Sequence, residues 1–147
     1  MSDTATVTIT QQQNYQFLVD FGEAIPTLIA DEPAPTGEGA GPEPAHMLLA
    51  AVANCLSASL LFSLLKFKQD AGGITTKATC AMGRNEKNRL RVQLIDVSIQ
   101  IKKPGLEVEH LDRILGQFEE FCTVSQSIQA GIPIKVRVLD GTGITLK

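Results

Sequence analysis

The stretch Ala45–Leu65, AHMLLAAVANCLSASLLFSLL, contains no charged residue. Its length and composition predict a helix of about twenty residues, which belongs either in a membrane or in a protein core. Asn54, Ser57, Ser59 and Ser63, the many alanines and the lack of a positive cluster at its start favour the core. A chain of 147 residues could cover such a helix completely by dimerising around it.

Proline and glycine mark both ends of this helix. Pro42-Glu43-Pro44 suits a first helical turn, and Gly72-Gly73 suits a helix end, so we expect a helix from this proline motif to about Asp70. The preceding residues 31–44, DEPAPTGEGAGPEP, have no periodicity and are predicted to form a loop. Structureless connections of this length are often functional or wrap a neighbour.

Alternating segments on both sides of the helix predict strands. We place a turn at residues 11–14 (QQQN), a second turn at 83–88 (GRNEKN) that closes a hairpin, and a bulge at Ile95-Asp96. This order predicts a single α+β domain over residues 1–147, with mainly antiparallel sheets around a long buried helix. The predicted strands are 5–10, 15–20, 26–30, 74–82, 90–101, 132–139 and 144–146, and the further helices are Glu107–Phe121 and Val124–Ala130.

Composition excludes several classes of function. The net charge of −3 and the scattered basic residues, none before Lys66, argue against a nucleic-acid partner. Three cysteines without a secretory signal pattern indicate a reducing, cytoplasmic setting, and we expect no membrane association. No phosphate-binding glycine motif is present, and we expect neither a cofactor nor a metal.

The cysteines are the candidate chemical groups. Cys55 lies within the apolar helix, where burial raises a thiol pKa, so its reactivity would need a nearby cation or hydrogen-bond donors. Cys122 precedes a short predicted helix, whose amide groups would lower its pKa, although Thr123 or Ser125 could cap that helix instead. Cys80 fits a core position on a strand. Cys55 and Cys122 are therefore either a redox pair or two buried hydrophobic side chains.

Two motifs carry a resemblance to a known family. Residues 41–69, GPEPAHMLLAAVANCLSASLLFSLLKFKQ, resemble the central helix of the OsmC/Ohr family, with a Pro-x-Pro start, a Leu-Leu-Ala-Ala run and then a cysteine. Residues 121–125, FCTVS, resemble the Cys-Pro-Val-Ser motif of that family. Residues 20–33 and the strand at 134–139 fit as well, so the resemblance covers nearly the whole chain.

The resemblance implies a fold and an activity. Members are mostly intertwined homodimers with active sites at the subunit interface, and they serve oxidative stress defence. The cysteine matching Cys55 would attack an organic hydroperoxide or hydrogen peroxide and become a sulfenic acid. The cysteine matching Cys122 would resolve it to a disulfide, which a dithiol such as a lipoyl group would reduce.

The chain departs from the family at the activating residues. Peroxidase members use an arginine from the N-terminal region, but no arginine here precedes Arg84. The family's glutamate position falls on His46, and Glu43 is the nearest acid. His46 lies nine residues from Cys55, on the opposite helix face and about 13 Å away along the axis, so it could approach only the partner's cysteine. Arg84, Arg89 or Arg91 could replace the arginine across the dimer.

Two alternatives stay open at this point. A non-catalytic protein of this fold could hold a small apolar or acyl ligand in an interface pocket lined by Met47, Leu48, Phe121 and the two cysteines. A zinc site formed by Cys55, Cys122 and His46 has suitable ligand types, but no CxxC or HxxxH spacing supports it.

Overall fold

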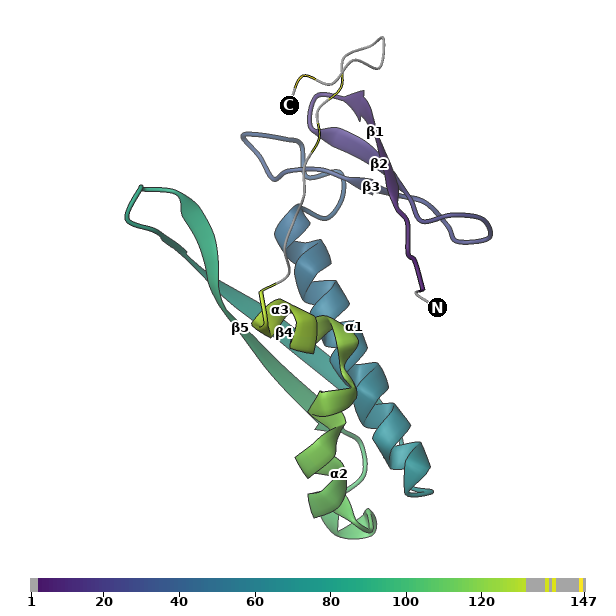
Figure 1. Ribbon diagram of the computed structural model, residues 1–147. Helices are drawn as coiled ribbons and strands as arrows, with labels where there is room; N and C mark the ends of the chain where they lie inside the picture. Colours follow the sequence, from purple (N-terminus) through teal and green to yellow (C-terminus); the bar gives the residue numbers. More distant parts are fainter. Residues whose placement is uncertain (1–2, 132–136, 138, 140–145, 147) are drawn as a thin grey trace.

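The computed structural model describes residues 3–131, 137, 139 and 146. Three strands are followed by a long helix, a hairpin and a run of short helices, which confirms the predicted α+β class with antiparallel sheets (Figure 1). The predicted strands at 132–139 and 144–146 lie largely outside the described residues. The elements are β1 (Thr8–Gln13), β2 (Gln16–Asp20), β3 (Leu28–Ala30), α1 (Pro44–Lys66), β4 (Ile74–Arg84), β5 (Leu90–Ile101), η1 (Gly105–Glu107), α2 (Leu111–Gln117), η2 (Phe118–Phe121) and α3 (Thr123–Gln129).

The N-terminal sheet has the order β1-β2-β3 and is antiparallel throughout. The turn predicted at residues 11–14 is wrong, because Gln11–Gln13 continue β1 and the chain reverses at Asn14-Tyr15. Asn14 has a φ of 50°, a left-handed conformation that asparagine tolerates, so two residues suffice for the turn. Within the described residues, these strands make few contacts beyond their mutual pairing.

The loop between β3 and α1 is organised by one carboxylate. Asp31 is only 3% exposed and accepts backbone hydrogen bonds from Glu32 at 2.8 Å, Ala40 at 3.0 Å and Glu38 at 3.1 Å. Gly41 completes the loop, because a Cβ there would collide with the carbonyl group of Ile29. The predicted loop is therefore irregular but fixed, and it delivers the chain to the start of α1.

Acid should loosen this loop through Asp31. The backbone hydrogen bond from Ala40, supported by those from Glu38 and Glu32, holds the pKa of Asp31 below its ordinary value of 3.8. A pKa lowered by folding contributes stability that is complete above the unfolded value and is lost as the pH falls through the folded one. We expect Asp31→Asn to lower the thermal midpoint at neutral pH, and the gap from wild type to narrow below pH 3.8, as followed by circular dichroism. Glu32→Gln is the control, and a gap independent of pH would contradict this role.

Helix α1 begins with Pro44 in its first turn, as predicted, but it ends at Lys66 rather than near Asp70. Lys68 takes a left-handed φ of 56°, so the amides of Lys68 and Gln69 turn back to the carbonyls of Leu65 and Leu64. This pattern is a Schellman motif, here formed without glycine. The two glycines predicted to end the helix instead lead into β4.

Only one face of α1 is buried within the chain. Val52, Leu56, Leu60 and Leu64 lie inside, whereas the opposite face exposes large side chains, of which Leu65 is 63% accessible. By length and composition alone α1 could cross a membrane, but core helices of soluble proteins meet the same criterion. A single chain therefore buries one face of α1, and the predicted full burial of this helix is not reached within it.

The hairpin β4–β5 packs against α1. Its bounds agree with the prediction, except that β4 continues to Arg84. The predicted bulge at Ile95-Asp96 is wrong, because the register shift falls between Ala81 and Met82, opposite Gln93. Ile95, Val97 and Ile99 then keep one regular alternation toward the helix, and the extra residue is taken up nearer the tip.

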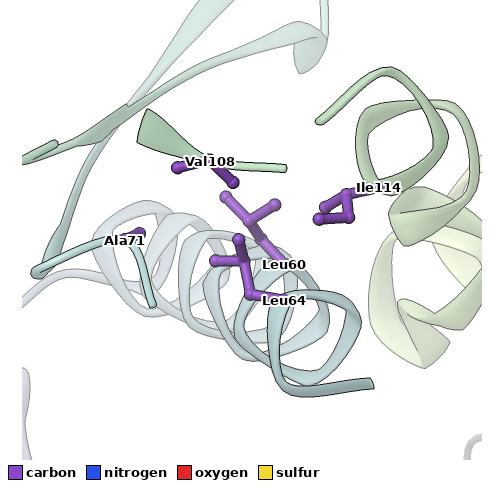
Figure 2. Close-up of a cluster of buried hydrophobic side chains, with 5 residues drawn as sticks. All are labelled: Leu60, Leu64, Ala71, Val108 and Ile114. Carbon is purple, nitrogen blue, oxygen red and sulfur yellow. The ribbon is translucent and has the colours of Figure 1, made fainter. Parts of the chain in front are cut away.

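The segment after the hairpin is not the continuous helix predicted for Glu107–Phe121. His110 has a left-handed φ of 59°, which separates the short turn η1 from α2, and η2 follows as a further 3-10 turn. The break lets an extended Val108 and a helical Ile114 enter the same cluster as Leu60, Leu64 and Ala71 (Figure 2). A single straight helix would not bring both side chains against α1.

Candidate functional site

Cys55 and Cys122 lie together where α3 begins against the middle of α1. Cys122 is completely buried, in a cluster with Val52 and Leu56, and Cys55 packs partly buried against the same cluster. The two thiols are reduced, lie in the same cluster and influence each other's pKa. The sequence left open whether these residues, 67 positions apart (122 − 55), lie close together, and a single chain brings them together.

The Cys122 side chain is the cap of helix α3. Its sulfur accepts a hydrogen bond from the backbone amide of Ser125 at 3.4 Å, so neither Thr123 nor Ser125 takes the capping role that was left open for them. Burial by itself would raise the pKa of Cys122, but the donors outweigh it and bring the pKa below its ordinary value. The polar groups that lower it are the Ser125 hydroxyl, the Cys55 thiol, the Ser125 amide and the Ser59 hydroxyl, of which the amide forms the hydrogen bond described above.

The pKa of Cys55 is shifted in the opposite direction, above its ordinary value. Burial raises the pKa of Cys55 and its neighbour Cys122 raises it further, while the amides of Val124 and Thr123 partly oppose the rise. Because the two thiols influence each other, the first ionisation belongs to the pair and not to one residue alone.

Cys55 is the thiol that reaches an opening. A shallow pocket of about 360 Å³ is lined by Cys55, Ala58, Ser59, Phe62 and Phe121. The Phe62 and Phe121 rings meet edge to face at a centroid distance of 5.3 Å. A small molecule can reach Cys55 beside these two rings, whereas Cys122 lies behind it.

The rim of this pocket carries one cation. The Lys66 ammonium lies 5.4 Å from the centre of the Phe121 ring, at the C-terminal end of α1. It lies eleven residues beyond Cys55 (66 − 55), about three helical turns away, so it borders the pocket and does not touch the thiols. Sequence reasoning missed Lys66 because the search for a cation was confined to the N-terminal region and the hairpin.

The other predicted site residues lie elsewhere in the chain. His46 is 67% exposed and its Nδ1 lies 3.6 Å from a Glu43 carboxylate oxygen, at the start of α1 and far from the cysteines. Arg84, Arg89 and Arg91 flank the turn of the β4–β5 hairpin, where they are exposed. A single chain therefore brings together only the two cysteines of the predicted set, and the roles of His46 and Glu43 stay a prediction.

The possible zinc site needs His46 as its third ligand. His46 does not join Cys55 and Cys122, and the part of the chain that the structure describes holds no group of three histidine, cysteine or acidic side chains arranged to bind a metal. Cys80 is half-buried on β4 and forms no pair with either thiol, which agrees with its predicted place in the sheet.

A second, larger cavity lies on another side of the cysteine cluster. Its volume is about 630 Å³, and it is bounded by the first half of α1, by β5 and by α3, with Leu48, Val52, Leu94 and Ile128 among its apolar lining. Of the residues predicted to line an interface pocket, Leu48 lines this cavity, Cys55 and Phe121 line the shallow pocket, and Met47 and Cys122 line neither. The interface pocket itself stays a prediction.

This arrangement defines a class of protein, namely a small α+β protein with a long central helix and two reduced cysteines in contact between that helix and a later helical turn. The sequence model described as OsmC-like protein matches residues 37–137. The chain therefore belongs to the OsmC-like protein family.

Solved structures of the same fold agree. An OsmC-like protein of unknown function from Vibrio cholerae is 18% identical with a TM-score of 0.72, over 86% of this chain and 94% of that one. The organic hydroperoxide resistance protein OhrB of Bacillus subtilis is 18% identical with a TM-score of 0.64, over 90% and 96%. An OsmC-like protein from Mycoplasma pneumoniae is 15% identical with a TM-score of 0.71, over 90% and 91%. No curated protein sequence matches the chain significantly.

Proposed function

We propose that this protein is a thiol-dependent peroxidase that reduces organic hydroperoxides or hydrogen peroxide in defence against oxidative stress. The observation that carries the proposal is the contact between the Cys55 and Cys122 thiols, with Cys55 open to an apolar pocket. Proteins named for organic hydroperoxide resistance share the fold, which supports the same chemistry here.

The proposed reaction has two steps on the protein. The Cys55 thiolate attacks the outer peroxide oxygen, the O–O bond breaks, and the alkoxide leaves as an alcohol after taking up a proton, which leaves a sulfenic acid on Cys55. The Cys122 sulfur then attacks the Cys55 sulfur, an S–S bond forms, and the hydroxyl group leaves as water. A dithiol such as a lipoyl group returns both sulfurs to thiols and is itself oxidised to a disulfide.

Access assigns the two roles. Cys122 is completely buried, so a peroxide meets Cys55 first. A proton can pass from Cys55 to the Cys122 sulfur when Cys55 reacts, because the two thiols lie in one cluster and influence each other's pKa. The amides of Thr123 and Val124 then stabilise the negative charge on the Cys55 sulfur.

The apolar pocket favours peroxides with a hydrocarbon body. Phe62 and Phe121 offer ring faces beside Cys55, so an aryl or alkyl hydroperoxide gains contact that hydrogen peroxide cannot.

We further propose that the protein acts as a cytoplasmic homodimer. The exposed apolar face of α1 and the N-terminal sheet, which makes few contacts with the other elements among the described residues, both support this assembly. In it, His46 and Glu43 of one subunit would approach the cysteines of the partner.

A second candidate function rests on the larger cavity. A space of about 630 Å³ with apolar walls from α1, β5 and α3 is of a size that holds a small ligand. A non-catalytic OsmC-like protein could bind a small apolar or acyl molecule there, with inert thiols.

The test is a titration of the reduced protein with cumene hydroperoxide, followed by peptide mapping without reductant. We expect one equivalent of peroxide to convert Cys55 and Cys122 to a disulfide and to leave Cys80 free. Thiols that persist under a large excess of the peroxide would refute the peroxidase and favour the ligand-binding function.

A further inference from the structure

Negative charge at the cysteine pair has to be stabilised without a cation in contact. The apolar side chains of the cluster that contains Cys122 come from α1, β5, η2 and α3, and within the described residues no cation shifts the pKa of either cysteine. Charged groups on these elements are exposed, among them Lys66 at the end of α1, Glu119 and Glu120 on η2, and Asp96 on β5. A buried thiolate without an ion partner depends on hydrogen-bond donors.

Two serine hydroxyls stand beside the Cys122 sulfur. Ser59 lies one helical turn beyond Cys55 on the same face of α1 and is 5% exposed. Ser125 lies in the first turn of α3 and is 7% exposed. Both hydroxyls lie close enough to the Cys122 side chain to lower its pKa and so to favour its charged form.

The Ser125 hydroxyl has no competing use. It is buried and makes no well-aligned hydrogen bond in the reduced structure, although its own backbone amide already donates to Cys122 at 3.4 Å. A buried hydroxyl without a partner is costly, so its presence needs an explanation. A hydroxyl proton can turn about its C–O bond toward the sulfur when the sulfur becomes negative.

We propose that Ser59 and Ser125 are positioning residues that hold the negative charge of the cysteine pair by donating their hydroxyl hydrogens to the Cys122 sulfur. They supply the stabilisation that a cation in contact with the sulfurs would otherwise supply, so the residues that line the pocket beside Cys55 are all uncharged and Lys66 stays at its rim. The inference deepens the proposed peroxidase function, but it concerns ionisation and not turnover, so either can fail alone.

The test follows thiolate formation by ultraviolet absorbance across pH in a Cys80→Ser background, which leaves only the paired thiols. We expect Ser59→Ala and Ser125→Ala each to raise the midpoint of the first ionisation by about one pH unit, because a hydrogen bond to a charged group contributes about that much. Ser59→Thr, which keeps the hydroxyl, should restore the midpoint.

Ser63→Ala is the matched control. Ser63 is also fully buried on α1, and its hydroxyl also has no partner, but it lies one further turn from the thiols. An unchanged midpoint in both Ser59→Ala and Ser125→Ala would overturn the proposal, as would an equal shift in Ser63→Ala. A shift caused by Lys66→Met, with none from the serine variants, would assign the charge to the ammonium and also overturn it. If Ser125→Ala does not fold, Ser59→Ala and its threonine variant decide the question alone.

Discussion

Reduced protein that carries Cys55→Ser is expected to lose peroxide consumption by about a thousandfold or more, because removing a nucleophile removes the chemical step itself. Cys55 is the thiol that lines the pocket, and Cys122 behind it has no exposed surface. The measurement is the initial rate of cumene hydroperoxide loss with a dithiol reductant in excess. Cys80→Ser, on β4 and outside the pair, should keep the wild-type rate.

Cys122→Ser should separate the two steps. Its Cys55 is expected to react once with peroxide and to stop as a sulfenic acid, which dimedone traps and mass spectrometry locates. Dimedone on Cys122 in the Cys55→Ser protein, with rapid turnover retained, would reverse the roles. Loss of activity in Cys80→Ser as well would point to a general loss of structure.

The sequence predicted those parts of the fold that depend on residues close together in the chain. The bounds of β5 and the start of α1 agree with the sequence pattern, because alternation and a proline-led first turn depend on near neighbours. The helix predicted for Glu107–Phe121 failed because its break at His110 serves packing against α1, a long-range demand that the amphipathic stripe does not reveal. The bulge was misplaced for a similar reason, since it is set by the pairing of two strands.

The site divides in the same way. The sequence indicated two cysteines and the direction in which each pKa moves, and the resemblance to a family indicated that they meet. The sequence did not reveal the side-chain hydroxyls from α1 and α3, Ser59 and Ser125, because they converge on Cys122 only in the folded chain. Lys66 also escaped notice, because its place beside Phe121 follows from the end of α1 meeting η2.

The second large expected effect is on dimerisation, and it follows from the exposed face of α1. Leu61, Phe62 and Leu65 are each at least half exposed along one side of a helix that has no charge before Lys66. A contiguous apolar face of this kind marks an interface. If a second copy covers it, a carboxylate placed there must lose its water when the dimer forms, which costs free energy. A symmetric interface contains each substitution twice, so this desolvation cost is doubled.

We therefore expect Leu61→Glu combined with Leu65→Glu to convert a dimer into a monomer, with a dissociation constant raised by about a thousandfold or more. Light scattering after size exclusion would report the mass across a dilution series. Leu106→Glu is the control, because Leu106 is fully exposed on η1 and away from α1, and a surface change of this kind has little effect. A wild-type protein that is monomeric at every concentration would refute the dimer. A double variant that stays dimeric would place the interface on another surface. The N-terminal sheet would be the next to test, because it makes few contacts with the other elements in the part of the chain that the structure describes.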